Sequence, residues 1–397
     1  MEITYGHSPY KKMFDNRDVY GIGFDELRAA KKPIRLGLTG FGGVALSKHI
    51  PAIARLRAIW EPVTLAAVCN RNERSGRRAS EIYGANWYAD VNDMLNNEQL
   101  DGVMICTTDA IHFEHAMLCM ERGFPVMIEK PLAVSLSEAK TMVDKAEKAG
   151  LLMMTVSNKR YSPPYRKVKA MMENGTLVDP AMFVAKFNLG YDYVDILEGG
   201  TIHIFDLMRY FMGDVRQLSA AAVRRYGYNR TGYPFDNGTS LIEFEGGAVG
   251  SIYTCSTALS LKPWESVEIY GEKCWVKVDD QYALTLYDDE TGPAKLWTPI
   301  MPNTLFFDEE FGGFMGLIEN FCNSIRGLET PLVTGYDGYK ALELVCAFHI
   351  AAATGEKVSL PLDPATADEI VAGIKERNGN RNEQRRSDTK GICRRTD

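Results

Sequence analysis

The sequence lacks the features that mark several classes of protein. No uninterrupted apolar run approaches the roughly 20 residues that a helix needs to cross a bilayer, and the polar residues 1–10 lack the apolar core of a signal peptide. The eight cysteines are scattered and form no CxxC pair, so reduced thiols are expected rather than a disulfide scaffold. No internal repeat is visible. We therefore expect a cytoplasmic protein without a membrane partner.

An excess of positive charge is also missing. The chain has 45 Lys and Arg residues against 52 Asp and Glu residues, a formal net charge of −7. Phosphates require a basic face, so no nucleic-acid partner is expected. The 45% hydrophobic and 24% charged residues are ordinary for globular proteins, and 397 residues argue for two or three domains.

Residues 34–157 show short apolar runs that alternate with segments of helical period. The expected strands are 34–38, 64–69, 103–106, 126–128 and 152–156, and candidate helices are 44–58, 74–83 and 113–122. Such alternation is typical of a parallel sheet with helices on both faces. The fold class expected here is therefore α/β, an N-terminal Rossmann doubly wound parallel sheet.

Residues 158–375 have a different texture, with short turns that permit antiparallel neighbours. The expected strands are 181–188, 239–245, 247–255, 265–270 and 274–279, and the expected helices are 162–174, 201–212, 314–326 and 337–354. This pattern predicts a C-terminal α+β domain with a large, mainly antiparallel sheet. Residues 1–33 are predicted to be an arm that docks on the main body or on a neighbouring subunit, and residues 376–397 a disordered tail.

A glycine motif of the form G-x-G-x-x-A directly follows the first expected strand, at Gly40, Phe41, Gly42, Gly43, Val44 and Ala45. The first glycine allows a tight turn, the second lets the backbone approach a pyrophosphate, and the alanine permits close packing of helix on strand. The start of the helix then offers free N–H groups to the phosphates. These residues predict dinucleotide binding.

The end of the second expected strand leaves the choice between NAD and NADP open. An acid usually stands there to bind the ribose hydroxyls of NAD, but this chain has Asn70 followed by Arg71. Arg71 is able to pair with the 2′-phosphate of NADP. Alternatively, Asn70 binds the hydroxyls of NAD while Arg71 covers the adenine.

The segment Glu129-Lys130-Pro131 directly follows the expected strand 126–128, and here the chain resembles the glucose–fructose oxidoreductase / inositol dehydrogenase / rhizopine-catabolism (Gfo/Idh/MocA) family. The likeness spans about residues 34–362. Its other parts are the T-P-x-x-x-H segment at 107–112 (with Thr108 in place of proline), R-[FY]-x-P at 160–163, a glycine-rich H-x-x-D helix at 199–206, and a closing segment at 319–338.

The resemblance implies hydride transfer between a nicotinamide and a carbinol carbon of a sugar, cyclitol or glycoside, in a homo-oligomer. It also implies that the domain over 158–375 binds the substrate and that its sheet forms a subunit interface. Lys130 would exchange the proton or bind the developing alkoxide, as this chemistry requires of a group beside the reacting oxygen. Glu129 would help to position the cofactor, Pro131 is often part of a cis bond, and Thr107, Thr108 and His112 would line the cofactor site.

His203 is the proton-transfer partner that the resemblance implies. Asp206 follows at i, i+3 and would share its helical face, where it is placed to orient the imidazole. Many family members have an aspartate four residues before this histidine, where this chain has Gly199. Either Glu198 substitutes for that aspartate, or the site works with lysine and histidine alone.

Arg160 and Tyr161 either reach the substrate pocket at the domain junction or bridge the domains. His112 and His115 stand at i, i+3 without an identifiable third ligand, so no metal is expected. Two other functions remain open: an NAD-dependent glycosidase that oxidises its substrate only transiently, and a nicotinamide-binding regulator without catalysis.

Overall fold

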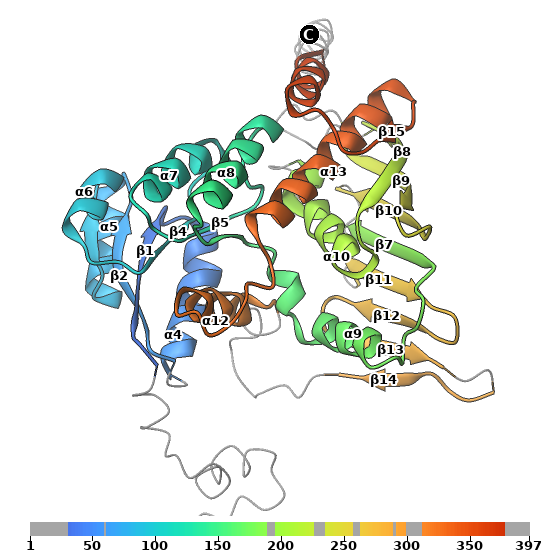
Figure 1. The fold of residues 1–397 in the computed structure, drawn as a ribbon, viewed down its shortest axis with the longest axis horizontal. Coiled ribbons are helices and arrows are strands. Elements are labelled where there is room, and N and C mark those ends of the chain that lie inside the picture. Colours follow the sequence, from blue (N-terminus) through green and yellow to red (C-terminus); the bar gives the residue numbers. More distant parts are fainter. Residues whose placement is uncertain are drawn as a thin grey trace, which may run out of the picture.

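The computed structural model describes residues 31–58, 61–188, 195–225, 235–256, 263–288, 291–298 and 312–377. These residues form two sheets, of six and nine strands, that lie side by side in Figure 1. The predicted fold class is confirmed. Most of the predicted arm (1–33) and tail (376–397) lies outside the described residues. Within the described chain, no helix has the length and apolarity needed to span a membrane.

The first sheet is wholly parallel, with strand order β3-β2-β1-β4-β5-β6. Its strands are β1 (Ile34–Thr39), β2 (Val63–Cys69), β3 (Asn86–Tyr88), β4 (Gly102–Ile105), β5 (Val126–Ile128) and β6 (Met153–Thr155). Its helices are η1 (Ala45–His49) running into α4 (Ile50–Ala58), α5 (Glu73–Tyr83), α6 (Val91–Asn97), α7 (Asp109–Glu121) and α8 (Leu136–Ala149). The strand order reverses between β1 and β4, where an open sheet leaves a crevice at its carboxyl edge.

The second sheet has the order β14-β13-β12-β11-β7-β10-β9-β8-β15, and all its pairs are antiparallel except β7 with β10. Its strands are β7 (Met182–Asn188), β8 (Val215–Val223), β9 (Asn237–Phe244), β10 (Val249–Cys255), β11 (Glu265–Tyr270), β12 (Trp275–Asp279), β13 (Ala283–Tyr287), β14 (Lys295–Trp297) and β15 (Val358–Ser359). The small residues of β8 carry little strand propensity, and this strand was not predicted.

The remaining helices include the four that the sequence predicts, with small shifts of their ends. They are η2 (Asn158–Tyr161), α9 (Pro163–Glu173), η3 (Leu197–Thr201), α10 (Ile202–Met212), α12 (Phe314–Ile325) and α13 (Gly335–Thr354), followed by a last helix over 364–377. Helices α9, α10 and α13 contact the second sheet, whereas α12 packs against α4.

The molecule has two halves, the first built around the six-stranded sheet and the second around the nine-stranded sheet. Helix α13 joins them (Figure 1). Its first turn packs so closely on β6 that a Cβ at Gly335 would stand 2.1 Å from the Met153 side chain, and one at Gly338 would stand 2.8 Å from Thr155. Further along, the helix contacts β8 and α10. Two glycines thus let one helix lie against both sheets.

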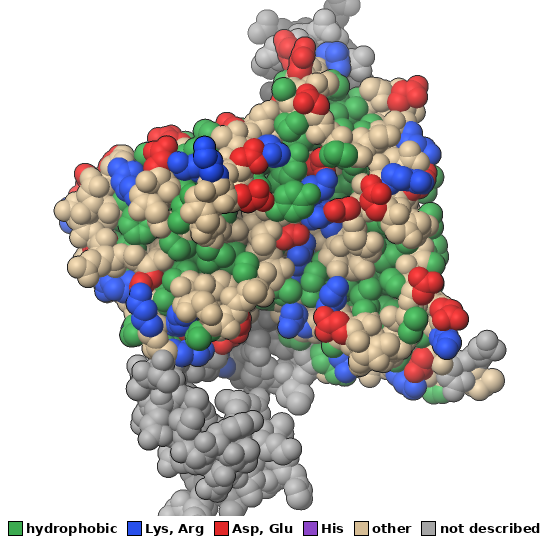
Figure 2. Space-filling view, viewed as in Figure 1, with side chains coloured by type: hydrophobic (Ala, Val, Ile, Leu, Met, Phe, Trp, Pro, Cys, Tyr) green, Lys and Arg blue, Asp and Glu red, His purple; other side chains and the backbone are tan. Residues whose placement is uncertain are grey.

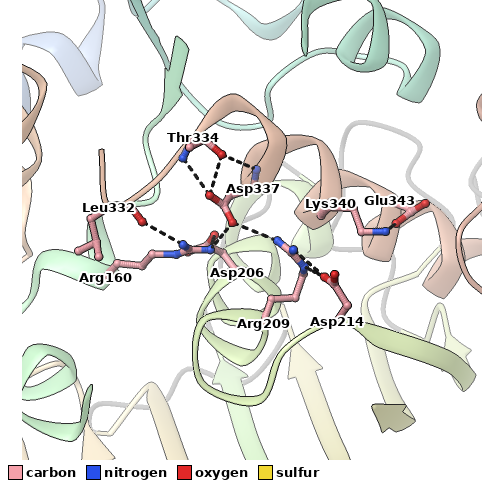
Figure 3. A network of polar contacts seen from close by, with 9 residues as sticks. All are labelled: Arg160, Asp206, Arg209, Asp214, Leu332, Thr334, Asp337, Lys340 and Glu343. Atoms are coloured by element: carbon pink, nitrogen blue, oxygen red, sulfur yellow. Dashed lines mark hydrogen bonds and ion pairs between the residues drawn. The ribbon is translucent and has the colours of Figure 1, made fainter. Parts of the chain in front are cut away.

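A network of ion pairs holds this junction together (Figure 3). Arg160, on η2, donates from Nε and Nη2 to both carboxylate oxygens of Asp206 on α10, at 2.9 and 2.7 Å. It also donates from Nη2 to Asp337 of α13 at 3.0 Å and from Nη1 to the carbonyl of Leu332. Arg209 donates to the same oxygen of Asp337. On the face shown in Figure 2, charged side chains of both signs gather along the boundary between the halves.

The network corrects two expectations. Asp206 was expected to orient His203, but the Arg160 guanidinium engages both of its oxygens. Arg160 was a candidate substrate residue, but it is only 4% exposed and its donors are taken by protein acceptors. A buried guanidinium needs several acceptors to offset its desolvation, so the bridging alternative for Arg160 holds.

The Asp206→Asn substitution is expected to destabilise the fold strongly, because it leaves the Arg160 charge in the interior with a weakened partner. We expect a loss of about 3 kcal/mol in the free energy of unfolding, measured by urea denaturation followed by tryptophan fluorescence. The matched control is Asp214→Asn, which removes the more exposed partner of Arg209 and should cost less than about 1 kcal/mol. Equal effects of the two substitutions would contradict this interpretation.

Candidate active site

A cavity of about 640 Å³ lies at the carboxyl edge of the six-stranded sheet. Its volume is that of a site for a small molecule or cofactor. Residues from the turn after β1 and from the ends of β2, β3, β4 and β5 line it; they include Gly40, Phe41, Gly42, Gly43, Val44, Asn70, Arg71, Asp90, Cys106, Thr107, Thr108, His115, Glu129 and Lys130. The structure thus places most of the predicted cofactor residues around one cavity.

The glycine motif shapes the floor of this cavity. Gly40 has a φ of +84°, and a Cβ there would stand 2.4 Å from the carbonyl oxygen of Cys106. A Cβ at Gly42 or Gly43, in contrast, would meet no atom within 4 Å. Gly40 is therefore required by the fold itself. Gly42 and Gly43 leave open space beside the start of a helix, which is the cradle that a pyrophosphate needs.

Asn70 has a fixed orientation at the adenosine end of the cavity. Its amide nitrogen donates to the carbonyl of Asn72 at 3.2 Å and to Oγ of Ser75 at 2.7 Å. Because the amide nitrogen is used in this way, the Oδ1 atom of Asn70 remains as an acceptor for a ribose hydroxyl. Arg71 is exposed beside it, and the carboxylate-bearing Asp90 lines the same cavity.

At the other end of the cavity lies a buried pair of side chains, His49 and Glu129, whose contact was not predicted from the sequence. Nε2 of His49 lies 2.6 Å from Oε1 of Glu129, whose Oε2 accepts from the backbone N–H of Lys130 at 3.1 Å. Burial disfavours the charge on His49, but Cys106 and Glu129 outweigh it and raise the pKa of His49 to about 10. Burial also opposes the charge on Glu129, but His49 and Lys130 hold the pKa of that carboxyl below its usual value. His49 thus positions Glu129, and Glu129 positions the backbone of Lys130.

Some residues of the segment 107–112 line the cavity, whereas His112 supports its wall. Thr107 and Thr108 line the cavity. The hydroxyl of Thr107 and Nδ1 of His115 are buried without a hydrogen-bond partner in the described structure, as expected of groups that bind a ligand. His112 does not line the cavity: its ring nitrogens lie 2.9 Å from the carbonyl of Pro131 and 3.2 Å from that of Thr107. It braces the cavity wall. The described residues contain no group of side chains able to hold a metal ion.

Lys130 reaches across the junction of the two halves. Its Nζ donates to the backbone carbonyl of Gly199 at 2.8 Å, and its peptide bond to Pro131 is cis. Burial lowers the pKa of Lys130 against the opposing effect of Glu129 and Glu198. The pKa of His203, on the first turn of α10, is lowered well below 6.5 by burial and then by the charges of Lys130 and Lys159. Lys130 and His203 are both half-buried, and the charge of Lys130 disfavours the protonated form of His203.

Gly199 belongs to the π-helical turn η3, which Asp195 holds from its N-terminal end. Oδ1 of Asp195 accepts from the backbone N–H of Leu197 at 2.7 Å and from that of Glu198 at 3.3 Å. The carboxylate of Glu198 accepts from Nζ of Lys375 at 2.8 Å. π-Helical turns of this kind are frequent at functional sites.

Tyr161 was expected at the substrate pocket or as a bridge between domains. Its hydroxyl donates to Oδ1 of Asn320 on α12 at 2.8 Å, and its ring lies beside Gly316. Since α12 packs against α4, Tyr161 packs onto the core of the first half, and it is not among the residues that line the cavity.

Two models of one family match the sequence. The model described as "Oxidoreductase family, NAD-binding Rossmann fold" matches residues 34–157, and the one described as "Oxidoreductase family, C-terminal alpha/beta domain" matches residues 197–360. Together these ranges cover more than half of the chain. The first contains the whole six-stranded sheet, and the second contains the nine-stranded sheet except for β7.

Several characterised proteins are similar to the chain over most of their length. D-apiose dehydrogenase of Paraburkholderia graminis is 28% identical over 326 residues, 78% of this chain and 86% of that protein. D-glucoside 3-dehydrogenase of Escherichia coli is 25% identical over 357 residues, 83% and 98% of the two chains. A solved structure of levoglucosan dehydrogenase with NADH and L-sorbose aligns with a TM-score of 0.75 at 19% identity, over 84% of this chain and 100% of that one.

Two substitutions in the glycine motif are expected to have opposite consequences. Gly42→Ala fills the open cradle and should weaken NADH binding by about tenfold or more, as a lost close contact does, with an unchanged thermal midpoint. Gly40→Ala forces a side chain onto the Cys106 carbonyl at a positive φ and should lower the thermal midpoint. NADH fluorescence titration and scanning calorimetry measure the two effects. A Gly42→Ala protein that binds NADH like the unchanged chain would refute the assignment of the cradle.

Proposed function

The chain belongs to the Gfo/Idh/MocA oxidoreductase family, and on this premise we propose that it transfers hydride reversibly between a nicotinamide and a secondary hydroxyl of a sugar, cyclitol or glycoside. The observation that carries the proposal is the Lys130 amine, which lies at the end of the dinucleotide cavity and contacts the Gly199 turn of the other half. An acid–base group is thereby placed where a cofactor and a substrate held by different halves would meet.

A nicotinamide bound in the cavity would accept the hydride from the carbinol carbon or return it to a ketone. The chain's own residues handle the proton. Lys130, with its lowered pKa, is suited to take the hydroxyl proton or to stabilise the alkoxide. His203, whose pKa is lowered well below 6.5 by burial and by the charge of Lys130, is neutral near pH 7 and offers a second group able to hydrogen-bond the substrate hydroxyl. These roles of Lys130 and His203 are part of what we propose.

We favour NAD over NADP as the cofactor. The free acceptor of Asn70 suits a ribose hydroxyl, whereas Asp90, which lines the same cavity, would repel a 2′-phosphate. The residues around the cavity fit a dinucleotide because the cradle at Gly42 is open and the buried hydroxyl of Thr107 has no hydrogen-bond partner among the described residues.

The substrate class follows from the relatives together with the site. The relatives reported above are named for apiose, a glucoside and levoglucosan, all of which carry ring or chain hydroxyls. Oxidation of a ring hydroxyl, such as the C3 hydroxyl of a glycoside, to a ketone would use Lys130 and His203 in the roles described. The described cysteines are all free thiols. Free thiols support a reducing location such as the cytoplasm.

We expect a panel of pentoses, hexoses, inositols and alkyl glucosides to contain a substrate that produces NADH in stoichiometric amount, read at the nicotinamide absorbance band. Turnover should be faster with NAD than with NADP. For oxidation, kcat/KM should rise with pH through a value below the 10.5 of an ordinary lysine, because the deprotonated amine of Lys130 is the base. Bond cleavage without net NADH would instead support the transient-oxidation glycosidase.

The variant that controls this experiment is Lys130→Met, which keeps the length of the side chain and removes its amine. It should lower kcat by about 10²- to 10⁴-fold, as loss of a general base does, while the Kd for NADH stays within about twofold. Unchanged turnover in this variant would refute the role of Lys130, and NADH binding without turnover on any panel member would favour the regulator.

The outer face of the nine-stranded sheet supports a proposal on assembly. The register places Val249, Met182, Tyr270, Trp275 and Tyr287 in one row across five neighbouring strands. Trp275 stacks between Tyr270 and Tyr287, with centroid distances of 5.1 and 3.8 Å. Apolar rows of this extent on a flat sheet mark interaction surfaces. We propose that a second copy of the chain covers this face in a homodimer or larger homo-oligomer.

The double variant Met182→Lys/Leu241→Lys is expected to dissociate this oligomer, because it places two charges on the apolar face where Leu241 is 67% exposed. Analytical ultracentrifugation should show a dimer or larger species for the unchanged chain and a monomer for the variant. Ile82→Lys, at a residue of α5 that is 55% exposed, is the matched control and should remain assembled. If the unchanged chain were a monomer in this experiment, the proposal would be refuted.

A further inference from the structure

The last helix, over residues 364–377, lies beyond the part of the chain that the C-terminal family model matches, which ends at residue 360. Asp363 caps its start through the backbone N–H of Thr366 at 2.9 Å. Ala367, Val371 and Ile374, at helical spacing, are buried against the body of the protein. These buried side chains pack one face of the helix onto the protein; Figure 1 shows the helix in red at the top of the view.

One end of this helix is fixed to the nucleotide-binding half. The two carboxylate oxygens of Asp368 accept from the backbone N–H groups of Leu136 and Ser137, at 2.7 and 3.0 Å. These are the first residues of α8, whose N–H groups have no partner within their own helix. An acidic side chain at this position satisfies two donors and interacts favourably with the helix dipole.

The other end of the helix reaches the substrate half. Nζ of Lys375 donates to Oε1 of Glu198 at 2.8 Å, and the Glu198 side chain is only 15% exposed. The residue after Glu198 is Gly199, whose carbonyl oxygen receives the amine of Lys130. Seven residues, or about 10 Å of helix, separate Asp368 from Lys375. The helix thus spans from α8 of one half to the π-helical turn of the other.

We propose that helix 364–377 is a strap across the two halves of the active site, in which Lys375 is a positioning residue for the Glu198–Gly199 turn and Asp368 anchors the strap to α8. The ion pair with Lys375 fixes the Glu198 side chain and thereby the turn η3. This turn places the Gly199 carbonyl against the amine of Lys130. The catalytic part of this inference rests on the proposed function, whereas the mechanical part stands on the contacts alone.

Amide hydrogen exchange, read by mass spectrometry on the full-length protein, tests the mechanical part. In Lys375→Met, exchange of the amides of residues 197–201 should accelerate by about tenfold or more, the effect expected when a charge-assisted hydrogen bond is lost. Asp368→Asn should accelerate exchange at residues 136–137 instead. Arg377→Met, an exposed cation on the same helix two residues away, is the matched control and should exchange like the unchanged chain.

Steady-state kinetics with NAD and the best substrate of the sugar panel test the catalytic part. Lys375→Met should lower kcat by about tenfold with the Kd for NADH within about twofold, and Lys375→Arg should restore most of kcat. Because Lys375 acts through Glu198, adding Lys375→Met to a Glu198→Gln protein should cost less than about twofold more.

Unchanged exchange at 197–201 in Lys375→Met would overturn the strap, as would an equal effect of Arg377→Met. If Lys375→Met lowered kcat by a further tenfold in the Glu198→Gln protein, Lys375 would not act through Glu198. If the unchanged chain turns over no member of the panel, the proposed function fails, but hydrogen exchange still decides whether the strap exists.

Discussion

The buried ion pair between Arg160 and Asp206 is the interaction on which the arrangement of the site depends. Arg160 follows β6 directly, and Asp206 stands one turn beyond His203 on α10. Transfer of both charges from water costs several kcal/mol unless every donor finds an acceptor. The Leu332 carbonyl and Asp337 supply the remaining acceptors, so a displacement of α10 would leave a charge unsatisfied. The pair therefore orients the helix that carries His203 relative to the sheet that carries Lys130.

The parts of the site that are local in the sequence could be predicted from it. The glycine motif and Glu129-Lys130-Pro131 each follow a short apolar strand, and parallel strands bring their carboxyl ends to one edge. The motif at Gly40 and Gly42 was therefore placed in the cavity together with Lys130, although 90 residues separate Gly40 from Lys130 in the chain. Five of the six strands were also predictable, because both faces of a parallel sheet are buried and its strands are continuously apolar. The edge strand β3 is only partly buried and was not predicted.

The contacts that were missed join residues without a common pattern. Spacing at i, i+3 placed Asp206 beside His203 on one helical face, but spacing does not reveal a competing cation 46 residues away. His49 gave only a weak signal, a lone histidine in the helix after the glycine motif, and its partner Glu129 comes from another strand. The helix over 364–377 escaped prediction in the same way, since Asp368 and Lys375 read as an ordinary solvated surface until their partners are known.

The glycine that replaces the expected aspartate gives the site its electrostatic character. A carboxylate at position 199 would stabilise the ammonium form of Lys130 and raise its pKa. The carbonyl of Gly199 accepts the same hydrogen bond without a full negative charge, so burial prevails and the pKa of Lys130 is lowered. The nearest counter-charge on this turn, Glu198, is itself shared with Lys375. A lysine held by a neutral acceptor can lose its proton more readily, which suits the role of base that we propose for Lys130.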